Sequence, residues 1–307
     1  MISSADVKRA AAEAGFDACG VARAAALGGA GATLRQWLDE GRHAGLGYME
    51  RNVDMRLDPR LLVPGAKSVV SVALGYNPSR LMQGPGRVAR YAYGDDYHDT
   101  IRSMLHRMKD ALGIEAKVCC DTAPISDKHW AAQAGLGWIG RHTLLVTPDW
   151  GSWVNLGELV TTEECDHYDT PAAAPCQACH RCVDACPNHA LAASGPPTID
   201  LRRCTAYHTI ESRADDLPPS LVTAGYAFGC DLCQQACPHN TRPGLRTREV
   251  DASRIATLES MGSMDEQAFR KAVKHTSMSR IKYPQWQRNL NRAAPHGGGE
   301  NSAPGSE

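Results

Sequence analysis

The sequence lacks any long run of apolar side chains. No stretch approaches the roughly 18 uninterrupted apolar residues that a membrane-spanning helix needs, and charges are spread through the first 30 residues. We therefore expect neither a membrane segment nor a secretory signal. Phenylalanine is scarce, with 3 in 307 residues, and the formal net charge is only −1. This charge excludes partner binding through overall positive charge, but it leaves room for a local basic surface.

Cysteine, in contrast, is abundant, with 12 residues that lie mostly between Cys165 and Cys237. Without an export signal we expect a cytoplasmic protein whose thiols stay reduced. In that compartment clustered cysteines more often bind metal or carry out redox chemistry than form disulfides. The length suggests one large domain or two ordinary ones, and 43% apolar residues are ample for a core.

The composition divides the chain into four segments. We expect a domain of helices and strands over 1–163, a domain rich in Cys, Pro and Asp over 164–240, a basic helical segment over 241–292 and a disordered tail over 293–307. The fold class is therefore α+β. Within the first domain the pattern predicts helices from Ser4, over 96–112 and over 126–134, and strands over 67–76, 118–121, 142–147 and 152–161.

Two groups of cysteines follow the spacing of bacterial ferredoxins. The first has the form C-x2-C-x2-C-x3-C-P and consists of Cys176, Cys179, Cys182 and Cys186. In such a run three thiolates hold one cluster and the fourth reaches another. The second group repeats the last three quarters of the run and consists of Cys230, Cys233 and Cys237. Cys204 is the only cysteine between the groups and can supply the missing ligand.

We therefore predict two [4Fe-4S] clusters with crossed ligands. The first cluster takes Cys176, Cys179, Cys182 and Cys237. The second takes Cys186, Cys204, Cys230 and Cys233. Zinc is the alternative, but zinc sites combine separate C-x2-C pairs rather than triplets that end in Cys-Pro. The other four are expected to be small buried hydrophobic residues: Cys19, Cys119, Cys120 and Cys165.

Two clusters carry single electrons and do not define a substrate. The chain is either an electron-transfer module that serves a partner enzyme, or a reductase whose first domain holds the substrate and a further redox cofactor. The first 160 residues, which a ferredoxin does not need, separate these hypotheses and favour the reductase.

From about residue 41 to 240, and more weakly to 292, the sequence resembles the cobalamin-dependent epoxyqueuosine reductases of tRNA modification. The resemblance rests on Arg56 and on GLGYM at 45–49, LVPGA at 62–66, ARYAYGDDYH at 89–98, DTAPI at 121–125, AGLGW at 134–138, GSWVNLGE at 151–158 and GCDLCQQACP at 229–238. It implies reduction of the epoxide of epoxyqueuosine to the alkene of queuosine at the wobble base of tRNA. It also implies a nitroreductase-like cobalamin-binding domain followed by a two-cluster ferredoxin-like domain. Many members add a C-terminal helical-repeat domain, so the chain is similar to a short member.

The resemblance also implies roles for single residues. Asp121 matches the general acid of the family, and we expect burial at the end of an apolar strand to raise its pKa. Removal of an epoxide oxygen takes two electrons and a proton at the leaving oxygen, which a carboxylic acid can deliver. The implied cobalamin contacts are Arg56, His98, Asp121, His142, Leu145, Ser152 and Leu156. The alternatives are ordinary ones: a turn cap for Asp121, a surface ion pair for Arg56, a helix start for His98 and core positions for the leucines.

The tRNA partner is expected at the basic end of the chain. Residues 240–292 carry 11 Lys or Arg against 5 Asp or Glu, whereas 120–170 carry 2 against 8. Basic and aromatic side chains alternate there, which suits the splayed bases of an anticodon loop: Lys282, Tyr283, Trp286 and Arg288. Inward packing of the two aromatic rings is the alternative.

We further expect a monomer that receives electrons from a low-potential donor. A corrinoid reductive dehalogenase for a small organic substrate is the alternative enzyme. The absence of a twin-arginine export signal and the basic segment both disfavour it.

Overall fold

The computed structural model describes residues 1–84, 86–176 and 178–293, so the tail predicted over 293–307 lies outside the described residues from 294 onward. At its centre is an antiparallel sheet with the strand order β1-β2-β7-β4. These strands are Ala18–Arg23, Ser68–Gly75, Val154–Thr161 and Ala116–Cys119. Apolar residues alternate between the two faces of β2 and β7, so both faces of the sheet carry a core.

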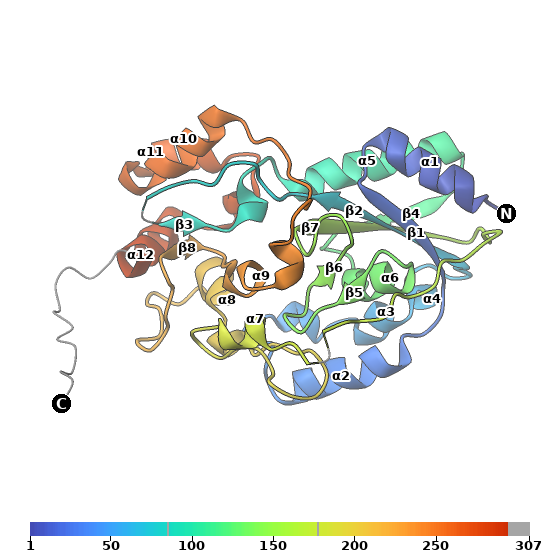
Figure 1. Cartoon of the computed structure of the whole chain (residues 1–307), viewed down its shortest axis with the longest axis horizontal. Coiled ribbons are helices and arrows are strands. Elements are labelled where there is room, and N and C mark those ends of the chain that lie inside the picture. Colours follow the sequence, from blue (N-terminus) through green and yellow to red (C-terminus); the bar gives the residue numbers. More distant parts are fainter. Residues whose placement is uncertain (85, 177, 294–307) are drawn as a thin grey trace.

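Two helices, α1 (Ser4–Ala14) and α5 (Tyr97–Leu112), cover one face of the sheet (Figure 1). Gly157 of β7 lets α5 approach closely, because a Cβ there would lie 2.6 Å from Ile101 Cγ2. Asp96 caps α5 by accepting a hydrogen bond from the backbone N–H of His98. The cap fixes His98 in the first turn of the helix, above the end of the sheet.

The opposite face is covered by α6 (Asp127–Gln133), whose Trp130 and Ala131 pack on the sheet. Beyond it lie the short hairpin of β5 (Trp138–Ile139) and β6 (Leu145–Val146) and three helices (Figure 1). These helices are α2 (Gly28–Asp39), α3 (Val53–Leu57) and α4 (Pro59–Leu62).

The cysteine-rich part consists of the short helices α7 (Arg181–Asp184), α8 (Thr205–Ile210) and α9 (Leu232–Gln235). It is followed by α10 (Ala252–Ser260), α11 (Glu266–Val273) and α12 (Tyr283–Ala293). A strand of the first half, β3 (Arg87–Val88), pairs in parallel with β8 (Tyr226–Phe228). Residues between 82 and 93 share a hydrophobic core with β8 and α10–α12. The predicted domain boundaries stay a prediction, and this segment of the first domain packs with the third.

Most predicted elements are present. The helices at 96–112 and 126–134 and the strand at 67–76 are confirmed as α5, α6 and β2. The strand predicted over 142–147 shrinks to β6, because Thr143 has a φ of 70°, which an extended strand does not allow. Strand β1 was not predicted, since its sequence ACGVAR is dominated by small residues. Among the described residues no helix is long and apolar enough to cross a membrane.

The aromatic residues expected to contact tRNA at the basic end of the chain were placed incorrectly. Trp286 is 1% exposed and stacks on Phe269 inside the core of the C-terminal helices. Tyr283 is partly buried and donates its hydroxyl to the carbonyl of Met264. The alternative of inward packing therefore holds, because α12 needs these rings to close its core.

Candidate functional site

Asp121 and His98 meet at one end of the sheet. Asp121 lies two residues beyond the end of β4, and its Oδ2 lies 2.9 Å from His98 Nε2. The other ring nitrogen of His98, Nδ1, lies 2.6 Å from Asp96 Oδ1. Burial alone would lower the pKa of His98, but the hydrogen bonds with Asp121 and Asp96 outweigh it and raise the pKa above 6.5. The ring is thus oriented between two carboxylates and holds a proton readily.

The expectation that burial raises the pKa of Asp121 is wrong. Its side chain is 50% exposed, and the hydrogen bond with His98 lowers its pKa below 3.8 despite the opposing effect of burial. Its backbone has a φ of 57°, and the N–H of Thr122 lies 2.6 Å from the carbonyl of Cys120 across it. This tight turn aims the carboxylate out of the strand end toward His98.

The ion pair predicts a difference in stability that depends on pH. The raised pKa of His98 contributes stability that is complete below about pH 6.5 and is lost as the pH rises through the raised value. The lowered pKa of Asp121 contributes stability that is lost only as the pH falls below about 3.8. We expect His98→Gln to lower Tm near pH 6, and we expect the difference in Tm from wild type to narrow as the pH rises through the raised pKa of His98. A difference in Tm that does not change with pH, or an equal difference in the exposed control His106→Gln, would contradict a stabilising His98–Asp121 ion pair.

Sequence reasoning missed two further side chains at this site. Arg280, in the 3-10 helix Ser277–Arg280, forms an ion pair of 3.1 Å with Glu211, and its charge helps to lower the pKa of Asp121. Tyr48 is 43% exposed, and burial, followed by the charges of Glu211 and Asp121, raises its pKa. Arg280 belongs to the predicted basic segment, but no local pattern separates it from the other basic residues there.

A cavity of about 160 Å³ opens beside the loop that carries Asp121. Its polar lining includes Arg56, Ser126 and Lys128, and its walls are apolar side chains such as Leu34 and Ile139. Arg56 donates through Nη2 to the carbonyl of Tyr48, and its buried Nε has no hydrogen-bond partner among the described residues. Burial lowers the pKa of Lys128 to about 8. Apolar walls with cations at one side fit a flat base that carries a phosphate, as the nucleotide tail of cobalamin does.

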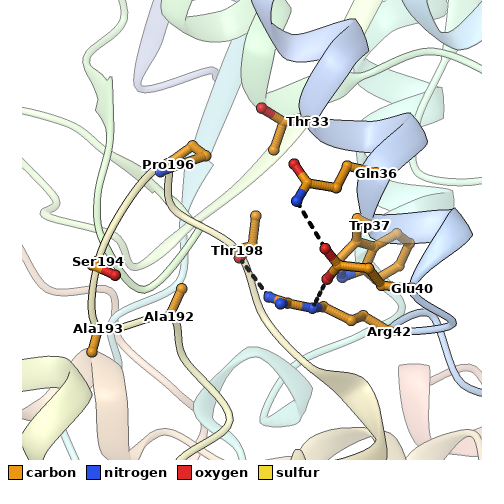
Figure 2. Close-up of a pocket in the computed structure, with 10 residues that line it drawn as sticks. All are labelled: Thr33, Gln36, Trp37, Glu40, Arg42, Ala192, Ala193, Ser194, Pro196 and Thr198. Atoms are coloured by element: carbon orange, nitrogen blue, oxygen red, sulfur yellow. Dashed lines mark hydrogen bonds and ion pairs between the residues drawn. The ribbon is translucent and has the colours of Figure 1, made fainter.

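A second cavity of about 310 Å³ lies between α2 and residues 192–198 (Figure 2). It shares Thr33, Trp37 and Thr198 with the cavity at Arg56. Figure 2 shows Arg42 bonded to both Glu40 and Thr198, so the two sides of this cavity are joined across its floor. The shared lining shows that the two cavities adjoin at Trp37.

The remaining predicted cobalamin contacts are scattered. Leu145 is buried in the core under α6, and Leu156 packs against the same cluster. His142 is 3% exposed and lies in the wall of a small cavity formed by cysteines. Ser152 is 2% exposed, and its hydroxyl accepts hydrogen bonds from Asn240 and Gln234 of the cysteine-rich part. These assignments stay predictions, and the hydrogen bonds of Ser152 add a structural role.

The structure brings together the four cysteines predicted for the first cluster. Cys176, Cys179, Cys182 and Cys237 line one small cavity with His142 and His239. After burial, the neighbouring thiol of Cys237 is the main reason why the pKa of Cys182 is raised, to about 11. Cys237 thus joins the first group although it is 51 residues beyond Cys186.

The other four cysteines form a second group. Burial and the thiols of Cys230, Cys204, Cys182 and Cys186 raise the pKa of Cys233, so the second group lies close to Cys182 of the first. Backbone N–H groups of Tyr207 and Ala206 act on Cys204 in the opposite direction, as expected where peptide dipoles stabilise thiolates. Outside the two groups, Cys119, Cys120 and Cys165 are buried as predicted, and Cys19 is partly buried.

Comparisons with known proteins agree with two groups of cluster-binding cysteines in this chain. The family model described as epoxyqueuosine reductase QueG, DUF1730, matches residues 56–127, and the model described as 4Fe-4S double cluster binding domain matches 175–240. An epoxyqueuosine reductase of Synechococcus sp. (strain CC9605) is 38% identical over 305 residues and covers 94% of each chain. The chain therefore carries a two-cluster iron–sulfur domain.

Solved structures give the same result for the fold. Epoxyqueuosine reductase from Streptococcus thermophilus superposes with a TM-score of 0.83 at 26% identity, over 94% of this chain and 80% of the other. An epoxyqueuosine reductase crystallised with an epoxyqueuosine-modified tyrosine tRNA stem loop superposes with a TM-score of 0.78 at 28% identity, with the same coverage. These relatives favour neither a dehalogenase nor a free-standing ferredoxin.

Proposed function

Because the chain belongs to the epoxyqueuosine reductase family of oxidoreductases, we propose that it reduces epoxyqueuosine to queuosine in tRNA. The observation that carries the proposal is the His98–Asp121 pair, held at the end of the sheet between the cavity at Arg56 and the exposed Arg280. The net reaction takes two electrons and two protons, and the epoxide oxygen leaves as water. The pair is placed to supply a proton to that oxygen.

The clusters are assigned to the two groups of cysteines. We propose Cys176, Cys179, Cys182 and Cys237 for one cluster, since they line one cavity, and Cys186, Cys204, Cys230 and Cys233 for the other, since their thiols act on one another. The cavity at Arg56 is proposed to hold the nucleotide tail of cobalamin, with Arg56 and Lys128 at its phosphate. When bound, the clusters supply electrons one at a time, and cobalamin supplies the low-potential centre of the reduction.

In this proposal the proton is held by the pair and not by Asp121 alone. A carboxyl with a lowered pKa is a weak proton carrier at neutral pH, whereas His98 with its raised pKa carries one. The hydrogen bond of 2.9 Å lets His98 pass its proton to the Asp121 carboxylate, which then delivers that proton to the leaving oxygen. Asp121 is the member that faces solvent and hence the substrate, because its side chain is 50% exposed and that of His98 is 13% exposed.

The tRNA is proposed to approach over Tyr48 and Arg280. Both are exposed at the mouth of the site, one as a ring on which a base can stack and the other as a guanidinium for a phosphate. The tRNA stem loop bound to one solved relative supports this class of partner. The target nucleotide leaves its stack to reach the pair, as in other enzymes that act on a base. We further infer a cytoplasmic monomer that depends on an external low-potential donor.

One experiment tests the function. The protein is purified without oxygen, its clusters are reconstituted, cobalamin is added, and nucleosides are analysed from tRNA that contains epoxyqueuosine after incubation with a low-potential reductant. Queuosine should appear only when the clusters, cobalamin and reductant are all present. A protein shown to hold both cofactors that still leaves epoxyqueuosine unchanged would refute the proposed function.

A further inference from the structure

Two carboxylic acids are packed together beneath the loop of Asp121. Glu158, near the middle of β7, is 0% exposed and faces α6. Its side chain lies within hydrogen-bonding reach of Asp127, the first residue of α6. Asp127 is itself partly exposed, although its Oδ1 is enclosed. The two acids thus connect the interior of the sheet with the surface beside the candidate active site.

Neither acid has a donor for its enclosed oxygens. Both carboxyl oxygens of Glu158, and Oδ1 of Asp127, lack a hydrogen-bond partner in the part of the chain that the structure describes. Two ionised carboxylates in contact without a donor would cost far more than a shared proton. Burial and mutual repulsion accordingly raise the pKa of Glu158. For Asp127, burial and the charge of Asp121 act in the same direction. At least one acid is therefore protonated at neutral pH.

The surroundings do not neutralise the two acids. On β2, Ser71 lies directly across from Glu158 and has an unpartnered hydroxyl. The titratable and charged groups that act on the two acids, or on which they act, are Arg56, Cys119, Cys120, Asp121 and Lys128. The two cations among them are Arg56 and Lys128. The charge of Arg56 lowers the pKa of Asp127 by less than burial and the charge of Asp121 raise it. The charge of Asp127 in turn opposes the lowering of the pKa of Lys128 by burial.

Asp127 is also directly behind the candidate catalytic residue. The backbone N–H of Asp121 acts on the carboxyl of Asp127 and partly offsets the effect of burial. The intervening residues form one short loop from the end of β4 to the start of α6. A proton held by the two acids therefore lies next to the residue that must recover one after each turnover.

We propose that Asp127 and Glu158 form a proton store that resets Asp121 during epoxide reduction. This inference rests on the proposed function, whose net reaction consumes two protons. The His98–Asp121 pair gives one proton to the leaving oxygen. The O–H bond of Asp127 then breaks, and its proton moves to the Asp121 carboxylate, which delivers it to the same oxygen as water departs. Asp127 is then protonated again from solvent, which restores the proton that it shares with Glu158. The two electrons come from the clusters and cobalamin.

Conservative variants of the fully loaded protein test the store. Asp127→Asn keeps an oxygen for the N–H of Asp121 but has no acidic proton, and Glu158→Gln keeps the shape of the buried side chain. We expect both to lower kcat about 10- to 100-fold above pH 7, with KM for tRNA unchanged, since general acids contribute at least this much. Small weak acids such as imidazolium should restore part of the rate of Asp127→Asn. The control Glu164→Gln changes a partly exposed acid beyond β7 and should behave as wild type.

Infrared spectra without substrate give a second readout. Wild type should show the carbonyl band of a protonated carboxylic acid at pH 7, and this band should shift or lose intensity in each variant. Unchanged kcat in both variants, a slow Asp127→Asn variant that weak acids do not rescue, or the absence of this band from wild type would overturn the store. If wild type shows the band but forms no queuosine, the proposed function is contradicted. The proton shared by Asp127 and Glu158 is then still supported.

Discussion

Asp121→Ala is expected to abolish most turnover without loss of any cofactor. Removal of the carboxylate takes away the exposed member of the proton-carrying pair, and general acid catalysis of this kind contributes about 10²- to 10⁴-fold. Iron, sulfide and cobalamin contents should stay at wild-type values, because Asp121 lies apart from both groups of cysteines. The measurement is queuosine formed per minute under saturating tRNA and reductant.

The matched control for this variant is Asp110→Ala. Asp110 is an acid near the end of α5 with a side chain that is 75% exposed, and it is remote from His98 along the same helix. Its loss should leave turnover unchanged. Near-normal turnover of Asp121→Ala, or an equal loss in Asp110→Ala, would remove Asp121 from the mechanism.

Each substitution of a ligand cysteine should remove one whole cluster. Pairs of substitutions then show which cysteines bind the same cluster. Cys237→Ala is expected to lower iron from about eight to about four atoms per chain, because a cubane that lacks one thiolate is labile. With crossed ligands, Cys237→Ala combined with Cys176→Ala still removes only one cluster. Combined with Cys204→Ala, it removes both. Iron and sulfide analysis with electron paramagnetic resonance of the reduced protein distinguishes these results.

An uncrossed arrangement gives the opposite pattern. If each run kept its own four cysteines, the pair of Cys237 and Cys204 would belong to one cluster, and their joint loss would spare the other. The control Cys165→Ala removes a buried thiol outside both groups and should retain full iron. Loss of both clusters from Cys237→Ala combined with Cys176→Ala would therefore refute the crossed assignment.

Most of the correct predictions came from the spacing of residues close together in the sequence. The ferredoxin run predicted which cysteines gather, including the distant Cys237, because the geometry of the run leaves its last thiol pointing away from its own cluster. Helical periodicity predicted α5, since its buried face repeats at Ile101, Leu105 and Met108. Strand β1 escaped prediction because small residues carry little pattern, and its place is set by pairing with β2.

The features that could not be predicted from the sequence depend on contacts between residues far apart in the chain. The pKa of Asp121 depends on His98 and Arg280, which come from other elements. The direction of its shift was therefore predicted incorrectly from burial alone. The contact of Glu158 with Asp127 likewise joins the middle of a strand to the start of a separate helix. Trp286 was placed on a surface because alternation of basic and aromatic residues also arises when one face of a helix is core.

The hydrogen bonds among Ser152, Gln234 and Asn240 couple the cysteine-rich part of the chain to the central sheet. Gln234 lies immediately after Cys233, and Asn240 follows Cys237 by three residues. Both hold the residue that leads into β7. Clusters bound at Cys233 and Cys237 would therefore brace, through these two amides, the residue that leads into β7.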